Sequence, residues 1–194
     1  DLVRSRGLGD VYKRQMHTGT GLESVISEKG PGAAIINYAD QTMDAMRTAM
    51  HLVAGGVLDR NPGARVAFIE SGASWLAAIA ERMDEVEEAH AVFVRPKLSR
   101  RPSQIMDDQV WSSFQHDRAC VVAAEAGVSG AKNCMWGSDY PHGEGTFPES
   151  RNIVDKLREE LKVSDETWRN VVGLNAARLF DIAPAVKTSE KIAA

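Results

Sequence analysis

Cysteine is scarce in this chain, and long apolar runs are absent. The two cysteines, Cys120 and Cys134, lie in apolar stretches without a C-x-x-C spacing, so we expect two small buried side chains in a reducing compartment rather than a disulfide or a zinc clip. No stretch of about 18 apolar residues occurs, and the first residues lack the apolar segment of a secretory signal. These absences predict a soluble, cytoplasmic protein without a membrane span.

A basic stripe and the common cofactor-binding motifs are also missing. The formal charge is −4, which argues against a nucleic-acid groove or an anionic membrane surface as the main partner. No G-x-G-x-x-G sequence or P-loop follows a candidate strand, so a nucleotide cofactor is not expected. A nucleophile elbow of the G-x-S-x-G type is absent as well. A small-molecule substrate remains as the expected partner.

The sequence alternates between stretches of helical periodicity and short apolar runs. With 194 residues, of which 43% are apolar, the chain can bury one core but is short for a complete α/β barrel. Alternating strands and helices predict right-handed βαβ units and a parallel sheet, which is an α/β fold. The expected helices are 39–56, 75–88, 119–126, one that starts at 148–150, and 164–180; the expected strands are 65–70, 110–114 and 134–138. Segment 94–108 has no clear period and is expected to be a long, irregular excursion or layer.

The beginning of the chain departs from this pattern. A strand is expected before His17, which leads into a glycine-rich loop, yet Lys13 and Arg14 put charges where a buried strand would have Val or Ile. Residues 1–15 resemble a translated sequencing-adaptor scar, which would lie outside the fold. A genuine charged and disordered arm is the alternative. The expected plan is therefore a scar or arm over 1–15, a domain over 16–182 and a polar tail over 183–194.

Two acidic residues follow candidate strands directly. Glu70 ends the run 65–70, and Asp139 comes just after the apolar run 133–136. Pro141 cannot donate to a strand ladder, so the strand should stop there and His142 should begin a loop. The carboxyl ends of parallel strands are where ligands and catalytic groups gather. The alternative is a polar strand end without chemistry.

Four motifs in order resemble the amidohydrolase-2 family, the branch of the amidohydrolase superfamily that includes the aminocarboxymuconate-semialdehyde and resorcylate decarboxylases. The motifs are His17-Thr18-Gly19-Thr20-Gly21, the stretch from Phe68 to Trp75, the stretch from Gly137 to His142, and Asn175-Ala176-Ala177-Arg178-Leu179-Phe180. The resemblance covers residues 16–182. It implies the carboxyl-terminal half of a TIM-type (β/α)8 barrel, with parallel strands alternating with helices and a divalent metal at the carboxyl-terminal mouth.

The resemblance also implies the metal ligands. His17 matches the family's fifth-strand histidine and Asp139 its eighth-strand aspartate, whereas the first-strand pair of ligands has no counterpart in this chain. Zinc is the first expectation for the metal and manganese the second. Asp139 or a neighbour would also move a proton, which makes it a candidate catalytic residue.

Three further side chains have open roles. Glu70 stands where the family more commonly has histidine, so it could ligate the metal, carry a proton or serve as a structural acid paired with an arginine, and the structural role ranks first. His142 is expected to contact substrate or steer Asp139, with a surface loop histidine as the alternative. His116 is ambiguous, because it follows the candidate strand 110–114. His51 and His90, on or beside helices, are expected to be ordinary surface or packing residues.

The resulting hypothesis concerns a parent enzyme. It is a metal-dependent amidohydrolase-2 enzyme that carries out hydrolysis or non-oxidative decarboxylation of a small carboxylated or carbonyl substrate. This chain is expected to be inactive alone, because half a barrel lacks the first-strand ligands. The alternative is a non-catalytic half-barrel interaction module that is completed by self-association, since half a barrel leaves two sheet edges unpaired.

Overall fold

The fold is built on a parallel four-stranded sheet. The computed structural model describes residues 13–17 and 28–183. Its strands are β1 (Lys13–His17), β2 (Arg65–Ile69), β3 (Val110–Phe114) and β4 (Cys134–Trp136), and they lie in the order β1-β2-β3-β4. Every neighbouring pair is parallel. The carboxyl ends of the strands therefore meet along one edge of the sheet.

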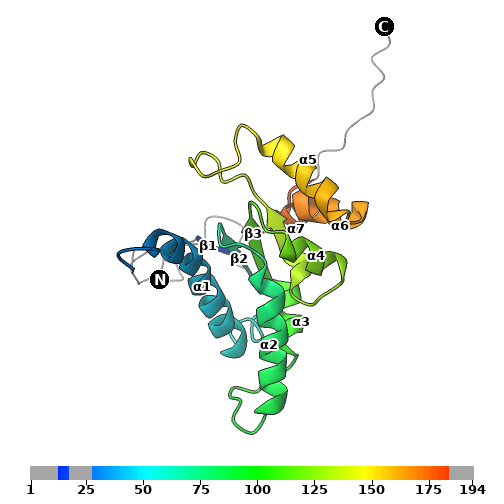
Figure 1. The fold of residues 1–194 in the computed structure, drawn as a ribbon. Coiled ribbons are helices and arrows are strands. Elements are labelled where there is room, and N and C mark those ends of the chain that lie inside the picture. Colours follow the sequence, from blue (N-terminus) through cyan, green and yellow to red (C-terminus); the bar gives the residue numbers. More distant parts are fainter. Residues whose placement is uncertain (1–12, 18–27, 184–194) are drawn as a thin grey trace, which may run out of the picture.

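Helices connect the strands and follow the last one. Figure 1 shows α1 and α2 side by side below the sheet, and α5 and α6 at the upper right. The helices are α1 (Ala33–Ala54), α2 (Trp75–Ala89), α3 (Pro102–Gln109), α4 (Ala119–Glu125), the 3-10 turn η1 (Ala131–Asn133), α5 (Ser150–Leu161), α6 (Asp165–Arg169), the π-helical turn η2 (Asn170–Leu174) and α7 (Asn175–Phe180). This alternation confirms the predicted α/β fold.

The sheet is covered by apolar contacts on both faces. Successive strand residues point to opposite faces, so Phe68 joins the large core with the helices while Ala67 joins a smaller cluster. Phe68 meets Trp75 of α2 edge to face, with ring centroids 5.4 Å apart. The smaller cluster contains Trp111 and, from α7, Leu179. Burial on both faces explains why the strands appear as nearly continuous apolar runs.

The strand expected before His17 is present as β1. Met16 pairs with Phe68 and His17 with Ile69, so residues 13–15 lie in the sheet, although they belong to the stretch interpreted as a scar. Residues 1–12 of that stretch and 184–194 of the expected tail lie outside the described residues. Gln15 is exposed. A polar residue is tolerated here because β1 has a partner strand on one side only among the described residues.

The prediction for segment 94–108 was partly wrong, because it contains most of helix α3. Pro102 occupies the first helical turn, and Gln104 Oε1 accepts a hydrogen bond from Arg101 N at 3.1 Å. The apolar period is weak because polar residues of this helix are buried and satisfied by distant partners. Ser103 bonds to Asp84 of α2 through both its N and Oγ.

Other boundaries shift modestly. Helix α1 begins at Ala33 rather than 39, and β4 ends at Trp136 rather than 138. Ser164 caps α6 as expected, accepting a hydrogen bond from Thr167 N at 3.2 Å, and the helical path continues through η2 and α7 to Phe180. In the part of the chain that is described, no helix is long and apolar enough to cross a membrane.

The two cysteines are buried free thiols, as the sequence predicts. Cys120 of α4 and Cys134 of β4 lie against one another in the core. The hydrogen bond with Cys134 and burial both raise the pKa of the Cys120 thiol. A buried thiol of this kind is chemically inert, because the thiolate is the reactive form.

Candidate metal centre

Both candidate acids occupy an unusual backbone conformation at a strand end. Glu70 directly follows β2 with φ of 57°, and Asp139 follows β4 with φ of 58°. Non-glycine residues rarely adopt this left-handed region, and such residues concentrate at functional sites. At Glu70 the conformation is supported by Ser113 of β3, whose Oγ accepts a hydrogen bond from Glu70 N at 3.0 Å.

The turn after Glu70 is fixed by a second loop. Asp117, in the loop after β3, accepts hydrogen bonds through Oδ2 from Ala73 N at 2.7 Å and Ser74 N at 3.0 Å. These are free amide groups at the start of α2, so Asp117 acts as its cap. Gly72, with φ of 63°, lies so close that an added Cβ would come within 3.1 Å of Asp117 Oδ2. The carboxylate of Glu70 is therefore carried by a rigid turn.

The loop that carries Asp139 and His142 is closed by backbone hydrogen bonds. His142 N donates to Asp139 O at 2.9 Å, and Thr146 N donates to Ser138 O at 2.8 Å. Gly145 approaches so closely that an added Cβ would lie 2.8 Å from Asp139 O. The loop therefore sets the direction of both side chains within a few residues of the strand.

Four side chains converge at this edge of the sheet. His17 Nε2 lies 2.9 Å from Glu70 Oε2. His142 Nδ1 lies 3.0 Å from Asp139 Oδ1 and 3.8 Å from the same Glu70 oxygen. The Asp139 side chain is only 4% exposed, whereas that of His142 is 52% exposed. Two imidazoles and two carboxylates thus form one cluster that is closed on the protein side and open to solvent on the other.

This cluster has the composition of a metal site. One ligand atom each from Glu70, Asp139 and His142 lies within 4.8 Å of the others. Carboxylate oxygens and imidazole nitrogens suit zinc and manganese, and a nearly buried carboxylate needs a compensating charge. The residues present therefore fit a divalent cation. His17, a ligand according to the family resemblance, contacts this group through Glu70.

The other histidines lie apart from this group. His116 is exposed in the loop after β3, and His51 and His90 are exposed on α1 and just beyond α2. Of the two expected roles of His51 and His90, surface or packing, the surface role is the one observed. Asp117 was overlooked in the sequence, although it too follows a strand closely, and its position after β3 is the signal that could have identified it.

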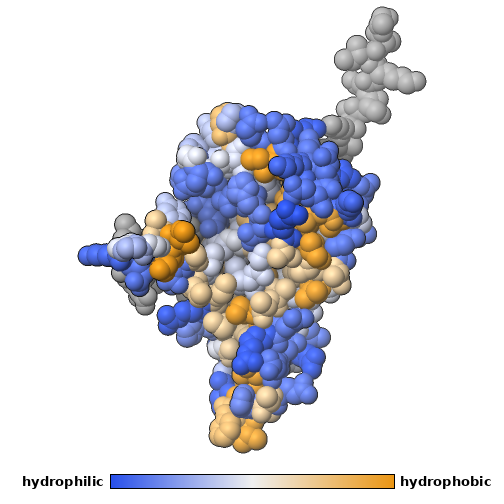
Figure 2. All heavy atoms as spheres, in the orientation of Figure 1, coloured by the Kyte–Doolittle hydropathy of each residue, from blue (hydrophilic) through white to orange (hydrophobic). Residues whose placement is uncertain are grey.

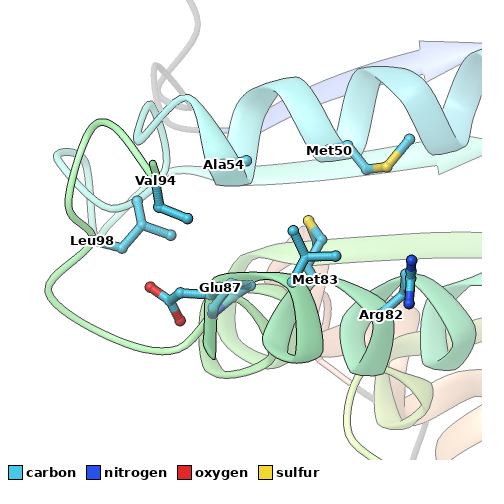
Figure 3. Close-up of a pocket in the computed structure, with 9 residues that line it drawn as sticks. Met50, Ala54, Arg82, Met83, Glu87, Val94 and Leu98 are labelled. Carbon is cyan, nitrogen blue, oxygen red and sulfur yellow. The ribbon is translucent and has the colours of Figure 1, made fainter. Parts of the chain in front are cut away.

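An apolar pocket lies apart from this group. It has a volume of about 370 Å³ and lies between α1 and α2, with Met50 facing Met83 and with Val94 and Leu98 closing one end (Figure 3). Its wall has few polar groups and none of the four clustered side chains. This pocket therefore does not serve the metal centre.

Comparisons with known proteins agree with this arrangement. The sequence model of the amidohydrolase-2 family, described as amidohydrolase, matches residues 14–182. No curated protein sequence is significantly similar to the chain. Among solved structures, the fold is similar to an amidohydrolase from Mycobacterium avium subsp. paratuberculosis K-10, with 23% identity, a TM-score of 0.57 and coverage of 78% of this chain and 36% of that one.

Two decarboxylases have a similar fold. The 5-carboxyvanillate decarboxylase of Sphingomonas paucimobilis is 20% identical with a TM-score of 0.62, and the match covers 87% of this chain and 49% of that one. The dihydroxybenzoic acid decarboxylase of Polaromonas sp. JS666, solved with bound manganese and 2-nitroresorcinol, is 16% identical with a TM-score of 0.55, and the match covers 81% and 48%.

The chain spans 36% to 49% of the length of these three structures. Its parallel sheet with alternating helices thus corresponds to part of a TIM-type barrel, as the sequence predicts. Because the family model matches residues 14–182, well over half of the chain, this protein belongs to the amidohydrolase-2 family.

Proposed function

We propose that this chain is the metal-binding, carboxyl-terminal half of a metal-dependent enzyme that acts on a small carboxylated or carbonyl substrate. The observation that supports this most strongly is the convergence of Glu70, Asp139 and His142 within 4.8 Å at the carboxyl ends of parallel strands. Strand ends of this kind hold the catalytic groups of barrel enzymes. Two of these three residues also occupy strand ends with positive φ.

In this proposal Asp139 holds a divalent cation together with Glu70 and His142, and His17 is the fourth candidate ligand. The first expectation from the sequence is zinc. The two carboxylates in the group suit manganese as well as zinc, and one structure of similar fold contains manganese. When bound, the cation supplies Lewis-acid chemistry to a substrate oxygen.

The protein side chains have separable tasks. Nδ1 of His142 faces the two carboxylates, so Nε2 is the nitrogen left to bind a substrate oxygen or exchange a proton. Asp139, nearly buried, orients that imidazole and holds negative charge at the site. The imidazoles of His17 and His142 both approach Glu70 Oε2. This supports a direct role of Glu70 at the centre rather than the structural pairing with an arginine that ranked first in the sequence analysis.

Non-oxidative decarboxylation and hydrolysis both suit this site. Two proteins of similar fold are decarboxylases of aromatic acids. In decarboxylation the carbon–carbon bond that joins the carboxylate group to the rest of the substrate breaks. Carbon dioxide leaves, and the remaining substrate carbon keeps the electron pair and takes a proton. A side chain that delivers this proton is required, and His142, with 52% exposure, is the accessible candidate. Release of carbon dioxide distinguishes the two reactions.

The isolated chain is proposed to be inactive although it binds metal. It spans about half the length of the structures it resembles, and substrate-binding loops of a barrel come from all eight strands. Turnover of a carboxylated substrate by the chain alone, abolished by Asp139→Ala, would contradict this part of the proposal.

A non-catalytic interaction module is the second candidate. Within the described ranges, β1 and β4 each have one neighbouring strand, and such open edges favour association. Light scattering combined with metal analysis separates the candidates. A metal-free, stable dimer supports the module.

Metal retention tests the first proposal. After dialysis against metal-free buffer, chain loaded with Mn²⁺ or Zn²⁺ should retain about one ion, as measured by mass spectrometry of the metal. Glu70→Gln and His142→Gln should each lower the retained amount, while His116→Gln, an exposed histidine outside the cluster, should not. Equal retention in all variants contradicts the assigned ligands.

A further inference from the structure

A polar cavity lies at the other end of the strands from the metal group. It has a volume of about 410 Å³. Its wall includes Arg65, the first residue of β2, and Trp111, near the start of β3, together with Asp107, Asp108, Lys132 and Arg178. The cavity therefore opens at the amino-terminal ends of the strands, and none of the clustered metal-site residues lines it.

Two guanidinium groups in this wall have no acidic partner among the described residues. Arg65 Nη1 donates to the carbonyl oxygen of Arg178 at 3.1 Å. Arg178 itself donates to the side-chain oxygens of Asn170, at 3.1 Å, and Asn175. All of these acceptors are neutral, and in the described part of the chain no carboxylate is paired with either guanidinium. Both arginines line the cavity, and guanidinium groups bind the oxygens of carboxylates and phosphates well.

The two acids of the wall are engaged elsewhere. Asp107 Oδ1 accepts a hydrogen bond from Gly130 N at 2.7 Å, and Asp108 Oδ2 accepts one from Arg100 Nη1 at 2.6 Å. Lys132 Nζ lies 4.0 Å from an oxygen of each. Their charges are thus met by Arg100 and Lys132, and the positive charge of the arginine pair stays uncompensated.

Trp111 supplies an independent sign of a missing acceptor. This residue is 6% exposed, and its Nε1 is a buried donor with no hydrogen-bond partner among the described residues. The indole N–H can only donate, and a buried donor without an acceptor is rare enough in folded proteins to need an explanation such as a bound ion. Trp111 also lines the cavity, so this unpartnered donor belongs to a residue of the cavity wall.

We propose that this cavity binds a small oxyanion, a phosphate or a carboxylate, between Arg65, Arg178 and the indole N–H of Trp111. Each guanidinium donates to oxygens of the anion, and the indole donates to a further oxygen. The site is separate from the metal centre, and its existence does not depend on the proposed enzyme function.

Titration of the 194-residue chain with inorganic phosphate, and separately with acetate, tests the proposal. Sodium chloride keeps the ionic strength constant, because screening alone alters surface charges. Calorimetry should show one saturable site for at least one of the two anions, and the stronger binder identifies the ligand as phosphate-like or carboxylate-like. Arg178→Gln should weaken this binding about tenfold or more, as expected for loss of a charged hydrogen bond.

Trp111→Phe is the second variant, and Arg151→Gln is the control. The phenylalanine ring keeps the apolar contacts but removes the N–H, so binding should weaken several-fold while the fold persists. Arg151 is 87% exposed on α5 and does not line the cavity, so its loss should leave binding unchanged. If Arg178→Gln fails to fold, Arg65→Gln takes its place. Absence of saturable binding, or binding that is equal in the cavity variants and the control, overturns the proposal.

Discussion

Glu70 Oε2 lies 2.9 Å from His17 Nε2, and this contact joins two neighbouring strands at the proposed metal centre. His17 pairs with Ile69 in the sheet, so the next residue along β2 brings its carboxylate to the imidazole. The same oxygen lies 3.8 Å from His142 Nδ1. Glu70 thus links a side chain of β1 with one from the loop after β4, which a purely structural acid at the surface would not do.

The loop that carries Asp139 should depend on Gly145. In Gly145→Ala the new Cβ would meet the carbonyl oxygens of Asp139, Ser138 and His142 at 2.8 to 3.0 Å. The loop must shift, so we expect a loss of about 1–3 kcal/mol in the free energy of unfolding and weaker Mn²⁺ binding. Urea unfolding and metal titration measure these effects. Gly143→Ala, where nothing lies within 4 Å, is the matched control, and equal behaviour of both variants would contradict the role of this loop.

Asp117 should stabilise the turn that carries Glu70. Asp117→Ala removes hydrogen bonds to Ala73 N, Ser74 N and Ser74 Oγ, so the free energy of unfolding should fall by about 2 kcal/mol, the upper range for a helix cap. Asp155→Ala, at an exposed position of α5, should change it little. If chemical unfolding shows that Asp117→Ala loses no more unfolding free energy than Asp155→Ala, the hydrogen bonds of Asp117 do not stabilise the turn.

Lys162 ends α5 in the left-handed conformation, with φ of 53°. Glycine adopts this conformation without strain, so Lys162→Gly should stabilise the chain by about 1 kcal/mol. In Lys156→Gly the same change falls inside α5 and should cost about 1 kcal/mol. Urea midpoints of the two variants should therefore move in opposite directions, and a shared direction would rule out relief of backbone strain as the cause.

Glu125 should contribute to the acid dependence of stability. Hydrogen bonds from Thr167 and Ser164 hold the pKa of its carboxyl below the ordinary value of 4.5. Because the folded-state pKa is lowered, the stabilisation is present above pH 4.5 and is lost as the pH falls through the folded-state value. Unfolding free energies measured from pH 7 to pH 3 should decline less steeply in Glu125→Gln than in the parent chain. Identical slopes would mean that these hydrogen bonds do not favour the ionised form.

Local sequence signals predicted the strand ends well and the tertiary partners poorly. Asp139 and His142 were identifiable because Asp139 follows the apolar run 133–136 and Pro141 marks the start of a loop, and this short loop keeps the two side chains together. Helix α3 was missed because its polar face is satisfied by residues distant in sequence, as in the bond of Ser103 to Asp84. Asp117 was overlooked for the same reason, since its partners precede it by more than forty residues.

The role of Glu70 shows the limit of sequence patterns most clearly. Its position after an apolar run placed it at a strand end, but three roles stayed open. Only the fold reveals that no arginine is paired with it among the described residues and that two histidines approach it. Distances of this kind depend on the pairing of β1 with β2, a tertiary relationship that the strand expected before His17 did not specify by itself.

Calorimetric titration of the metal-free chain with Mn²⁺, compared with Asp139→Asn, tests the central claim most directly. Asparagine keeps the shape of the side chain but removes its charge, so the account predicts one binding site in the parent chain and affinity at least about tenfold lower in the variant. Asp165→Asn, an exposed aspartate on α6, should bind as the parent does. Mn²⁺ binding of equal strength in Asp139→Asn and the parent, or no binding by the parent, would contradict a metal centre at this edge of the sheet.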